Sequence, residues 1–378
     1  MSHCQRSSFL STLSRRSSRF STHRKPFLRS ISTTSVRMTA NINNAAAWLT
    51  EAKAHPFQVK EAPSYTPAEN EILVKNHAVA INPVDGSLQS KAWWPMNYPT
   101  ILGQDVAGEV VQVGPNVARF QPGDRVVGHA VGMATKRLQD NAFQAYTILQ
   151  TNMASQLPNE ISYEDAAVLP LGLSTAASGL FQDEFLHLQL PAEPRRPATG
   201  KVLLVWGGAG SVGSNAIQLG VAAGYEVFTT ASPKNFDYVK KLGASQVFDY
   251  HSATVAQDLV AALQGKTVAG AMDCIGFAAT PLTVEVVSKS QGVNFVSTVK
   301  GGFQAPEGVT VKSVFGTTIK DNQVGKAIYE DYLPKALKAG TFIPAPVALV
   351  AGKGLESVQA AVDLQAQGTS AQKVVVSL

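Results

Sequence analysis

The stretch Lys201–Gly224 has the sequence KVLLVWGGAGSVGSNAIQLGVAAG and decides the fold. Its apolar run Lys201–Trp206 predicts a buried parallel strand, and apolar residues at helical spacing predict a helix over Ser211–Ala223. Between them Gly208, Gly210 and Gly213 make the spacing G-x-G-x-x-G. In a dinucleotide site the first glycine makes the tight turn, the second admits the pyrophosphate and the third lets helix and strand pack closely. The motif alone also fits an ordinary glycine-rich turn, but its flanking strand and helix favour a dinucleotide site at the helix N-terminus.

The next predicted strand, Tyr225–Ala231, decides which dinucleotide is bound. An NAD site carries Asp or Glu about 20 residues after the first glycine, where the carboxylate binds the ribose 2′-hydroxyl. Residues 229–232 are Thr, Thr, Ala and Ser, and Lys234 follows. A hydroxyl and a cation suit a 2′-phosphate, so the sequence predicts NADPH. Ser232 equally suits the N-cap of a helix that begins at Pro233, and one serine can serve both purposes.

Composition limits the class of protein. The 378 residues, 45% of them hydrophobic, suffice for two domains with separate cores. Two cysteines, Cys4 and Cys274, exclude a disulfide framework and a four-cysteine zinc site. The net charge of +5 comes from residues 1–38, which hold eight Lys and Arg and no acid, leaving 24 basic and 27 acidic residues elsewhere. We therefore predict no nucleic-acid partner, and the lack of a long apolar run predicts no membrane partner.

Residues 1–38 are rich in Ser and Arg, which is typical of a mitochondrial transit peptide. This interpretation predicts a mitochondrial matrix location. The alternatives are a disordered tail, or translation that starts at Met38 and gives a cytoplasmic protein.

The body of the chain divides into parts that differ in predicted secondary structure. Short β segments with Gly and Pro turns fill residues 45–160, among them Ile72–Ile81, Val106–Val113 and Asp124–Val127, and predict a partly open antiparallel β-barrel. Strands and helices alternate from Lys201, which predicts a doubly wound parallel (Rossmann) sheet in an α/β protein. A helix over Gln323–Leu337 and a β tail follow. We place the catalytic domain at 39–165, the NADP-binding domain at 166–325, and the return to the catalytic domain at 326–378.

Several further motifs carry a family resemblance. They are Asn82-Pro83-Val84-Asp85, Gly103–Val110 (GQDVAGEV), Gly123–Val126 (GDRV), Leu169–Leu171 with Thr175-Ala176, and Lys373–Val376. With the glycine loop, they resemble the medium-chain dehydrogenase/reductase superfamily over about Asn44–Leu378. The resemblance is greatest to its zinc-independent fungal branch, quinone-reductase-like proteins and trans-acting enoyl reductases, and implies a GroES-like catalytic domain. Mitochondrial enoyl-thioester reductases are similar too, but Trp93 stands where that branch has its tyrosine acid.

Departures from the family's zinc enzymes predict that no metal is bound. Those enzymes have Gly-His-Glu where this chain has Gly103-Gln104-Asp105, and a cysteine ligand that Asn82–Asp85 lacks. The barrel histidines His55, His77 and His129 have no cysteine or carboxylate at ligand spacing.

The resemblance also implies site residues. For the coenzyme these are Pro83, Val84, Thr175, Gly208, Ala209, Gly210, Ser211, Val212, Gly213, Ser232, Lys234, Asn235, Tyr250, Ile275 and Gly276; for the substrate they are Ser297, Thr298, Val299, Lys300 and Gly301. The aromatic cluster described next adds Trp93 to the substrate residues. Tyr250 equally suits a core aromatic residue. The cluster Trp93, Trp94, Met96 and Tyr98 suits either an apolar lid over a flat substrate or barrel packing.

The predicted function is an NADPH-dependent reductase that transfers hydride to an α,β-unsaturated carbonyl (enoyl or enone) or a quinone without zinc. Asn82 and Asp85 are the polar residues we assign to the catalytic site, although Asp85 equally suits a structural role in holding the family's turn at Asn82–Asp85. The substrate is a small molecule, either free or tethered to a carrier, and the protein is a monomer or homodimer. The alternative is a non-catalytic NADPH-binding sensor or carrier protein on the same fold.

Overall fold

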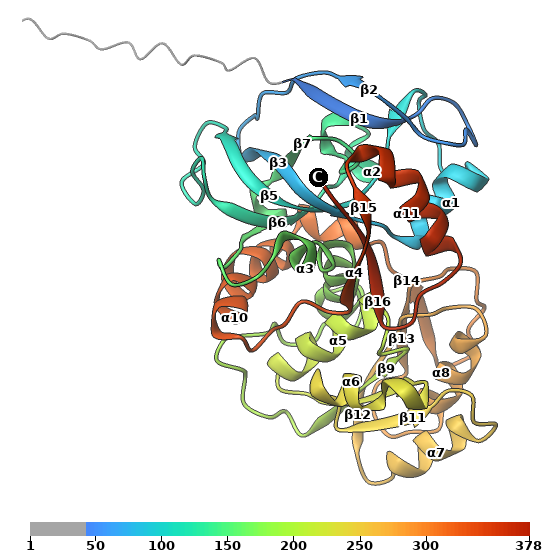
Figure 1. Cartoon of the computed structure of the whole chain (residues 1–378). Helices are drawn as coiled ribbons and strands as arrows, with labels where there is room; N and C mark the ends of the chain where they lie inside the picture. The colour runs from blue at the N-terminus through green and yellow to red at the C-terminus, as the bar shows by residue number, and fades with distance from the viewer. Residues whose placement is uncertain (1–42) are drawn as a thin grey trace, which may run out of the picture. The chain divides into compact units, whose positions relative to one another are not determined.

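The computed structural model describes residues 43–378, so the predictions for residues 1–38 lie outside the described residues. The body of the chain contains one parallel sheet and two sheets built mainly from antiparallel pairs (Figure 1). Among the described residues no helix has the length and apolar character needed to cross a membrane.

The parallel sheet has six strands in the order β11-β10-β9-β12-β13-β14. The strands are β9 (Lys201–Trp206), β10 (Glu226–Ala231), β11 (Gln246–Asp249), β12 (Thr267–Asp273), β13 (Phe295–Thr298) and β14 (Thr310–Ser313). The helices around it are α4 (Pro170–Phe181), α5 (Ser211–Ala222), α6 (Phe236–Lys241), α7 (Val255–Ala262) and α8 (Ala279–Ser288). Every strand pair is parallel, which confirms the predicted doubly wound sheet.

Strand β9 shows why this sheet is buried on both faces. Leu203 and Val205 belong to a core shared with α4 and α5, whereas Val202 and Leu204 belong to a second core shared with α7 and α8. Successive side chains of a strand point to opposite faces, so a continuous apolar run fills two cores at once.

Strands from residues 44–156 and from residues 347–377 form the mainly antiparallel part of the predicted fold class, called the antiparallel half below. A three-stranded sheet contains β1 (Asn44–Leu49), β2 (Gln58–Ala62) and β4 (Thr100–Ile101). A seven-stranded sheet contains β3 (Glu71–Ala80), β5 (Asp105–Val113), β6 (Arg125–His129), β7 (Tyr146–Gln150), β8 (Ala154–Gln156), β15 (Val347–Lys353) and β16 (Gln372–Ser377). Strand β16 pairs antiparallel with β3, so the end of the chain returns to the sheet formed by its beginning. The domain boundaries at 165/166 and 325/326 stay predictions.

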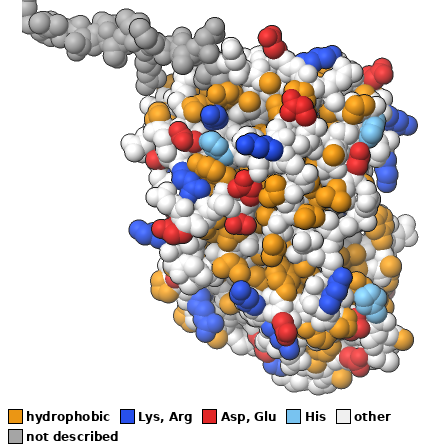
Figure 2. Space-filling model, viewed as in Figure 1, with side chains coloured by type: hydrophobic (Ala, Val, Ile, Leu, Met, Phe, Trp, Pro, Cys, Tyr) orange, Lys and Arg blue, Asp and Glu red, His pale blue; other side chains and the backbone are white. Residues whose placement is uncertain are grey.

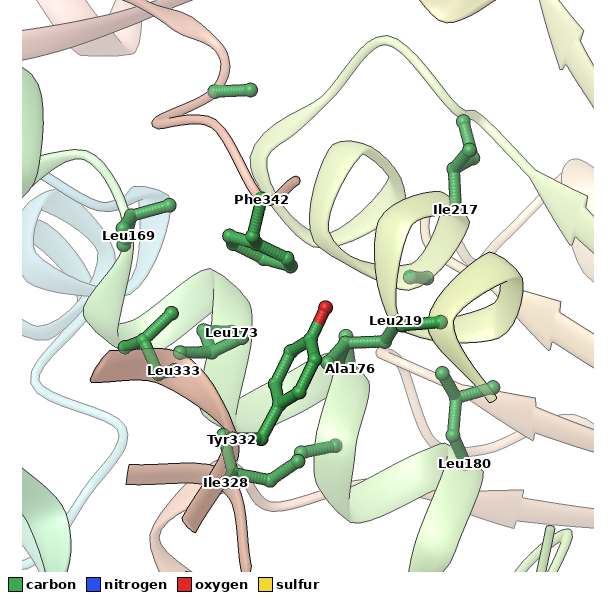
Figure 3. Close-up of a cluster of buried hydrophobic side chains, with 14 of the residues drawn as sticks. Leu169, Leu173, Ala176, Leu180, Ile217, Leu219, Ile328, Tyr332, Leu333 and Phe342 are labelled. Carbon is green, nitrogen blue, oxygen red and sulfur yellow. The ribbon is translucent and has the colours of Figure 1, made fainter. Parts of the chain in front are cut away.

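The remaining helices are short. They are α1 (Pro83–Lys91), α2 (Gly132–Thr135), α3 (Tyr163–Ala167), α9 (Gln323–Lys326), α10 (Leu333–Ala339) and α11 (Val358–Ala366). Figure 3 shows Leu173 of α4, Leu219 of α5 and Leu333 of α10 meeting in one buried cluster. This cluster joins α4 and α5 to α10, which lies on the segment that leads back to the antiparallel half.

Three local predictions differ from the structure. The motif Asn82–Asp85, interpreted as a turn, opens the nine-residue helix α1. The helix predicted over Gln323–Leu337 is interrupted by a π-helical segment, Ala327–Tyr332. Strand β14 was not predicted, because its sequence TVKS is too short and polar to show a strand pattern.

On the face shown in Figure 2, Lys and Arg side chains are interspersed with Asp and Glu, and apolar side chains lie between them. That face therefore lacks a large field of one sign.

Candidate functional site: a dinucleotide cavity beside a buried polar cluster

The loop between β9 and α5 is shaped by its glycines. Gly207 has φ +83°, so the tight turn is made there, one residue before Gly208, to which the sequence pattern assigned it. A Cβ on Gly213 would lie 2.2 Å from the carbonyl oxygen of Gly207, because α5 touches the loop at that point. A Cβ on Gly210 would meet only that same oxygen, at 3.8 Å. The backbone is thus open where α5 begins, and an open helix N-terminus suits a pyrophosphate.

The hydroxyl side chains at the end of β10 make different contacts. Thr229 Oγ1 donates to the carbonyl of Val205 at 2.7 Å, and Thr230 Oγ1 accepts from the backbone N–H of Gly207 at 2.9 Å. Thr229 therefore links β10 to β9, and Thr230 links β10 to the glycine loop. Ser232 is the next hydroxyl along the chain, and it lines the adjoining cavity.

A cavity of about 700 Å³ opens over this loop. It is lined by the predicted coenzyme residues Ala209, Gly210, Ser232, Lys234, Asn235, Tyr250 and Ile275. Its lining also includes Thr230, His251, Leu282, Thr369, Ser370 and Ala371, which the sequence did not indicate. His251 could have been found, because it directly follows the predicted residue Tyr250 in the sequence. In the structure the two ring centres lie 4.0 Å apart. No local signal marks residues 369–371, which lie more than 130 positions beyond Ser232.

The other predicted coenzyme residues lie outside that lining. Gly208, Ser211, Val212 and Gly213 form the loop and the first turn of α5, Pro83 and Val84 begin α1, and Thr175 is buried on α4. Gly276 lies beneath Lys300, since a Cβ there would come within 2.4 Å of Lys300 Cγ. The coenzyme roles of all these residues stay predictions.

Asn82 and Asp85, the predicted catalytic residues, lock the start of α1 as a capping box. The backbone N–H of Asn82 donates to Asp85 Oδ2 at 2.8 Å, and both side chains are buried. Burial, with a smaller effect from the charge of Asp105, raises the pKa of the Asp85 carboxyl to about 7. This geometry fixes the position of Pro83 and Val84, which follow Asn82 directly.

The side chain of Asn82 enters a buried ion pair. Lys373 Nζ lies 2.9 Å from Asp105 Oδ2 and also donates to Asn82 Oδ1. Asn82 Nδ2 donates to the same Asp105 oxygen at 2.8 Å, while Asp105 Oδ1 accepts from the backbone N–H of Leu171 at 2.6 Å. The exposed fractions of the Lys373 and Asp105 side chains are 5% and 0%. One carboxylate thereby joins α1, β16 and the start of α4.

A second set of polar side chains continues from this cluster. His129 Nδ1 lies 2.9 Å from Ser174 Oγ, and His129 Nε2 lies 3.4 Å from Gln104 Oε1. Ser174 Oγ in turn lies 2.7 Å from the hydroxyl of Tyr329, on the π-helical segment. Burial lowers the pKa of His129 to about 4, so the imidazole is neutral at physiological pH.

The predicted substrate residues divide into buried and exposed groups. Ser297 Oγ donates to the carbonyl of Gly179 and Thr298 Oγ1 to Asp273 Oδ2, so both buried hydroxyls are occupied inside the fold. Lys300 is exposed, and its ammonium lies 5.7 Å from the ring centre of Phe277, which is itself 74% exposed. Val299 is half-buried and Gly301 is exposed.

Trp94, which follows Trp93 directly, connects the antiparallel half to the parallel sheet. Trp93 is 51% exposed and its indole N–H donates to Ser87 Oγ at 2.9 Å. Trp94 stacks on Phe315 with ring centres 5.7 Å apart. Phe315 follows β14, so this stack bridges the antiparallel half and the parallel sheet. Both uses proposed for the aromatic cluster, lid and packing, agree with this position.

Two protein-family models match this chain. The model described as "Alcohol dehydrogenase GroES-like domain" matches residues 68–159, and the one described as "Zinc-binding dehydrogenase" matches residues 211–337. A curated relative from Emericella nidulans, "Zinc-binding alcohol dehydrogenase domain-containing protein cipB", is 90% identical over 341 residues, covering 90% of this chain and 100% of that protein. The chain belongs to the medium-chain dehydrogenase/reductase superfamily.

Further members of the superfamily are similar along nearly the whole length. "Trans-enoyl reductase himH" of Aspergillus japonicus is 38% identical, with 90% of this chain and 98% of that protein covered. The crystal structure of Escherichia coli quinone oxidoreductase complexed with NADPH has the same fold, at a TM-score of 0.66 and 21% identity, with 89% and 100% covered. Medium-chain dehydrogenases/reductases are oxidoreductases that use NAD(P)H, and the glycine loop and open helix N-terminus of this chain fit such a dinucleotide.

Zinc, which the description "Zinc-binding dehydrogenase" implies, does not fit the residues at the polar cluster. Zinc sites are built from thiolate, imidazole and carboxylate ligands. Here Asn82 and Gln104 present amides, and the ammonium of Lys373 contacts Asn82 and Asp105. Over residues 43–378 the structure brings together no group of three His, Cys, Asp or Glu able to hold a metal.

Proposed function

We propose that this chain is an NADPH-dependent reductase that adds hydride to an α,β-unsaturated carbonyl or a quinone without zinc. Support for the phosphorylated coenzyme comes from the end of the cavity next to β10. Ser232, Lys234 and Asn235 line the cavity there, and residues 229–232 offer no carboxylate for a ribose 2′-hydroxyl. Lys234 is exposed and has no ion-pair partner among the described residues, so its ammonium is available to a phosphate.

Support for a conjugated carbonyl substrate comes from the relatives and from the aromatic cluster. A superfamily member 38% identical to this chain has the name trans-enoyl reductase. Trp93 and the Trp94–Phe315 stack offer flat apolar surface between the two halves. A flat, conjugated molecule is the kind of ligand such surfaces bind.

When bound, NADPH supplies the hydride from C4 of its nicotinamide. The protein's part is to position the partners and exclude water. We assign Asn82 and Asp85 to positioning: the capping box fixes Pro83 and Val84, and the Lys373–Asp105 pair fixes Asn82 in turn. Neither buried side chain is placed to protonate a substrate directly.

The test follows NADPH absorbance at 340 nm with a panel of enones, enoyl thioesters of pantetheine, and quinones. We expect NADPH to be consumed and NADH to be used much more slowly. NADPH deuterated at C4 identifies the reaction, because carbon–carbon double-bond reduction leaves deuterium on the β-carbon and quinone reduction leaves none on carbon. Lys234→Ala should raise the KM for NADPH, whereas Lys241→Ala, an exposed lysine at the end of α6 and outside the cavity lining, should not.

Two results would overturn the proposal. Equal use of NADH and NADPH would contradict the phosphate site. Tight NADPH binding without turnover of any compound in the panel would instead support a sensor or carrier protein.

A further inference from the structure

The loop Gly368–Ala371 connects α11 to β16 and reaches the dinucleotide cavity from the other half of the fold. Helix α11 packs on α1, and β16 pairs with β3, so both neighbours of the loop belong to the antiparallel half (Figure 1). Thr369, Ser370 and Ala371 nevertheless line the cavity over the glycine loop. The chain therefore brings residues 369–371, which precede its last strand, to the coenzyme end of the parallel sheet.

Asn235 joins this loop to the end of β10. Its Nδ2 donates to Ser232 Oγ at 3.1 Å and to Ser370 Oγ at 3.2 Å. A hydroxyl oxygen that accepts a hydrogen bond keeps its own hydrogen to donate. Neither serine hydroxyl has an acceptor among residues 43–378. Both O–H groups are thus available to a ligand in the cavity.

Ser232, Ser370 and Lys234 together provide two hydroxyl donors and a cation at one end of the cavity. A phosphate monoester, with about −1.5 to −2 charges and three acceptor oxygens, is the ligand that such a group recognises. Resting on the NADPH-dependent function proposed above, we propose that Ser370 is a specificity-determining residue for the 2′-phosphate of the coenzyme. The loop Gly368–Ala371 then forms the outer wall of the phosphate site.

The loop is also covalently continuous with the buried polar cluster. Thr369 Oγ1 donates to the carbonyl of Gln372 at 2.8 Å, which links the loop to the first residue of β16. Lys373, the next residue, is the cation paired with Asp105. A phosphate bound by Ser370 therefore stabilises β16, whose Lys373 positions Asn82. The bound coenzyme thus contacts both halves of the fold.

The test measures dissociation constants of NADPH and NADH by titration of the full chain, with 2′,5′-ADP and 5′-AMP as fragment probes. Ser370→Ala should weaken NADPH and 2′,5′-ADP about three- to tenfold, through loss of one charge-assisted hydrogen bond. Ser370→Glu should weaken them more than about tenfold, because a carboxylate then faces the phosphate. Binding of NADH and 5′-AMP should stay unchanged in both variants.

The matched control is Gln367→Glu, which introduces the same charge at an exposed residue three positions away and outside the cavity lining. It should leave all four constants within about twofold, since exposed charges are well screened. As a second readout, amide hydrogen exchange in residues 368–372 should slow when NADPH is added to the wild type and less when NADH is added.

The outcomes separate this inference from the function on which it rests. If the wild type prefers NADPH but Ser370→Glu keeps that preference, the loop is not part of the phosphate site and the inference fails alone. Equal weakening of NADPH and NADH would show a merely structural role and refute it too. If the wild type itself shows no preference, the proposed NADPH dependence falls as well.

Discussion

Replacing Lys373 by Met should strongly destabilise the fold, because it removes one partner of a buried ion pair. Lys373 Nζ and Asp105 Oδ2 lie 2.9 Å apart, which corresponds to an attraction of about 6 kcal/mol at an effective dielectric constant of about 20. Desolvation offsets most of that attraction in the intact protein. The variant leaves Asp105 buried without its cation, and such losses cost about 3–5 kcal/mol.

Urea unfolding followed by circular dichroism measures this loss, with the slope of the transition checked for constancy. The control is Lys289→Met, which breaks a Lys289–Glu285 pair of similar length, 2.8 Å, whose lysine side chain is 58% exposed. We expect this control to lose less than about 1 kcal/mol. Adding Asp105→Asn to Lys373→Met should recover at least about 1 kcal/mol, since the unpaired charge is then gone. The reasoning is refuted if Lys373→Met and Lys289→Met lose the same free energy of unfolding.

Variants at Asp85, Gly213 and Gly210 test the site further. Asp85 has a pKa of about 7 in the folded protein against an ordinary value near 4, so between these values the folded state binds a proton that the unfolded state has lost. As the pH rises from 5 to 7, the protein should therefore lose about 2–3 kcal/mol of unfolding free energy relative to the Asp85→Asn variant. Unfolding free energies of the two proteins at pH 5, 7 and 8 check this, and a constant difference would contradict it. Gly213→Ala should destabilise the fold by about 1–3 kcal/mol, because its Cβ would overlap the carbonyl oxygen of Gly207. Gly210→Ala should change the unfolding free energy by no more than about 0.5–1 kcal/mol, but it should weaken NADPH binding measured by titration. The same loss of stability in both glycine variants would contradict the loop geometry described above.

Local sequence patterns predicted those parts of the fold that depend on residues close together in the chain. The strand Lys201–Trp206 was predicted with the bounds that the structure has, and the helix after it was one residue too long. Continuous apolar runs and glycines at fixed spacing need only local chemistry to be interpreted. At Asn82–Asp85 the family resemblance implied a turn, although the capping box there starts a helix.

The sequence by itself determined a dinucleotide loop, the parallel sheet around it, and a strand end without a carboxylate. Only the tertiary structure decided what surrounds them. Lys373 reaches Asn82 across 291 positions, and Ser370 reaches Asn235 across 135. In sequence, Lys373 is one charge before an apolar run and Ser370 is one polar residue in a loop. Their partners are set by the pairing of β16 with β3, a long-range choice that residue spacing does not encode, because it depends on how separate cores pack together.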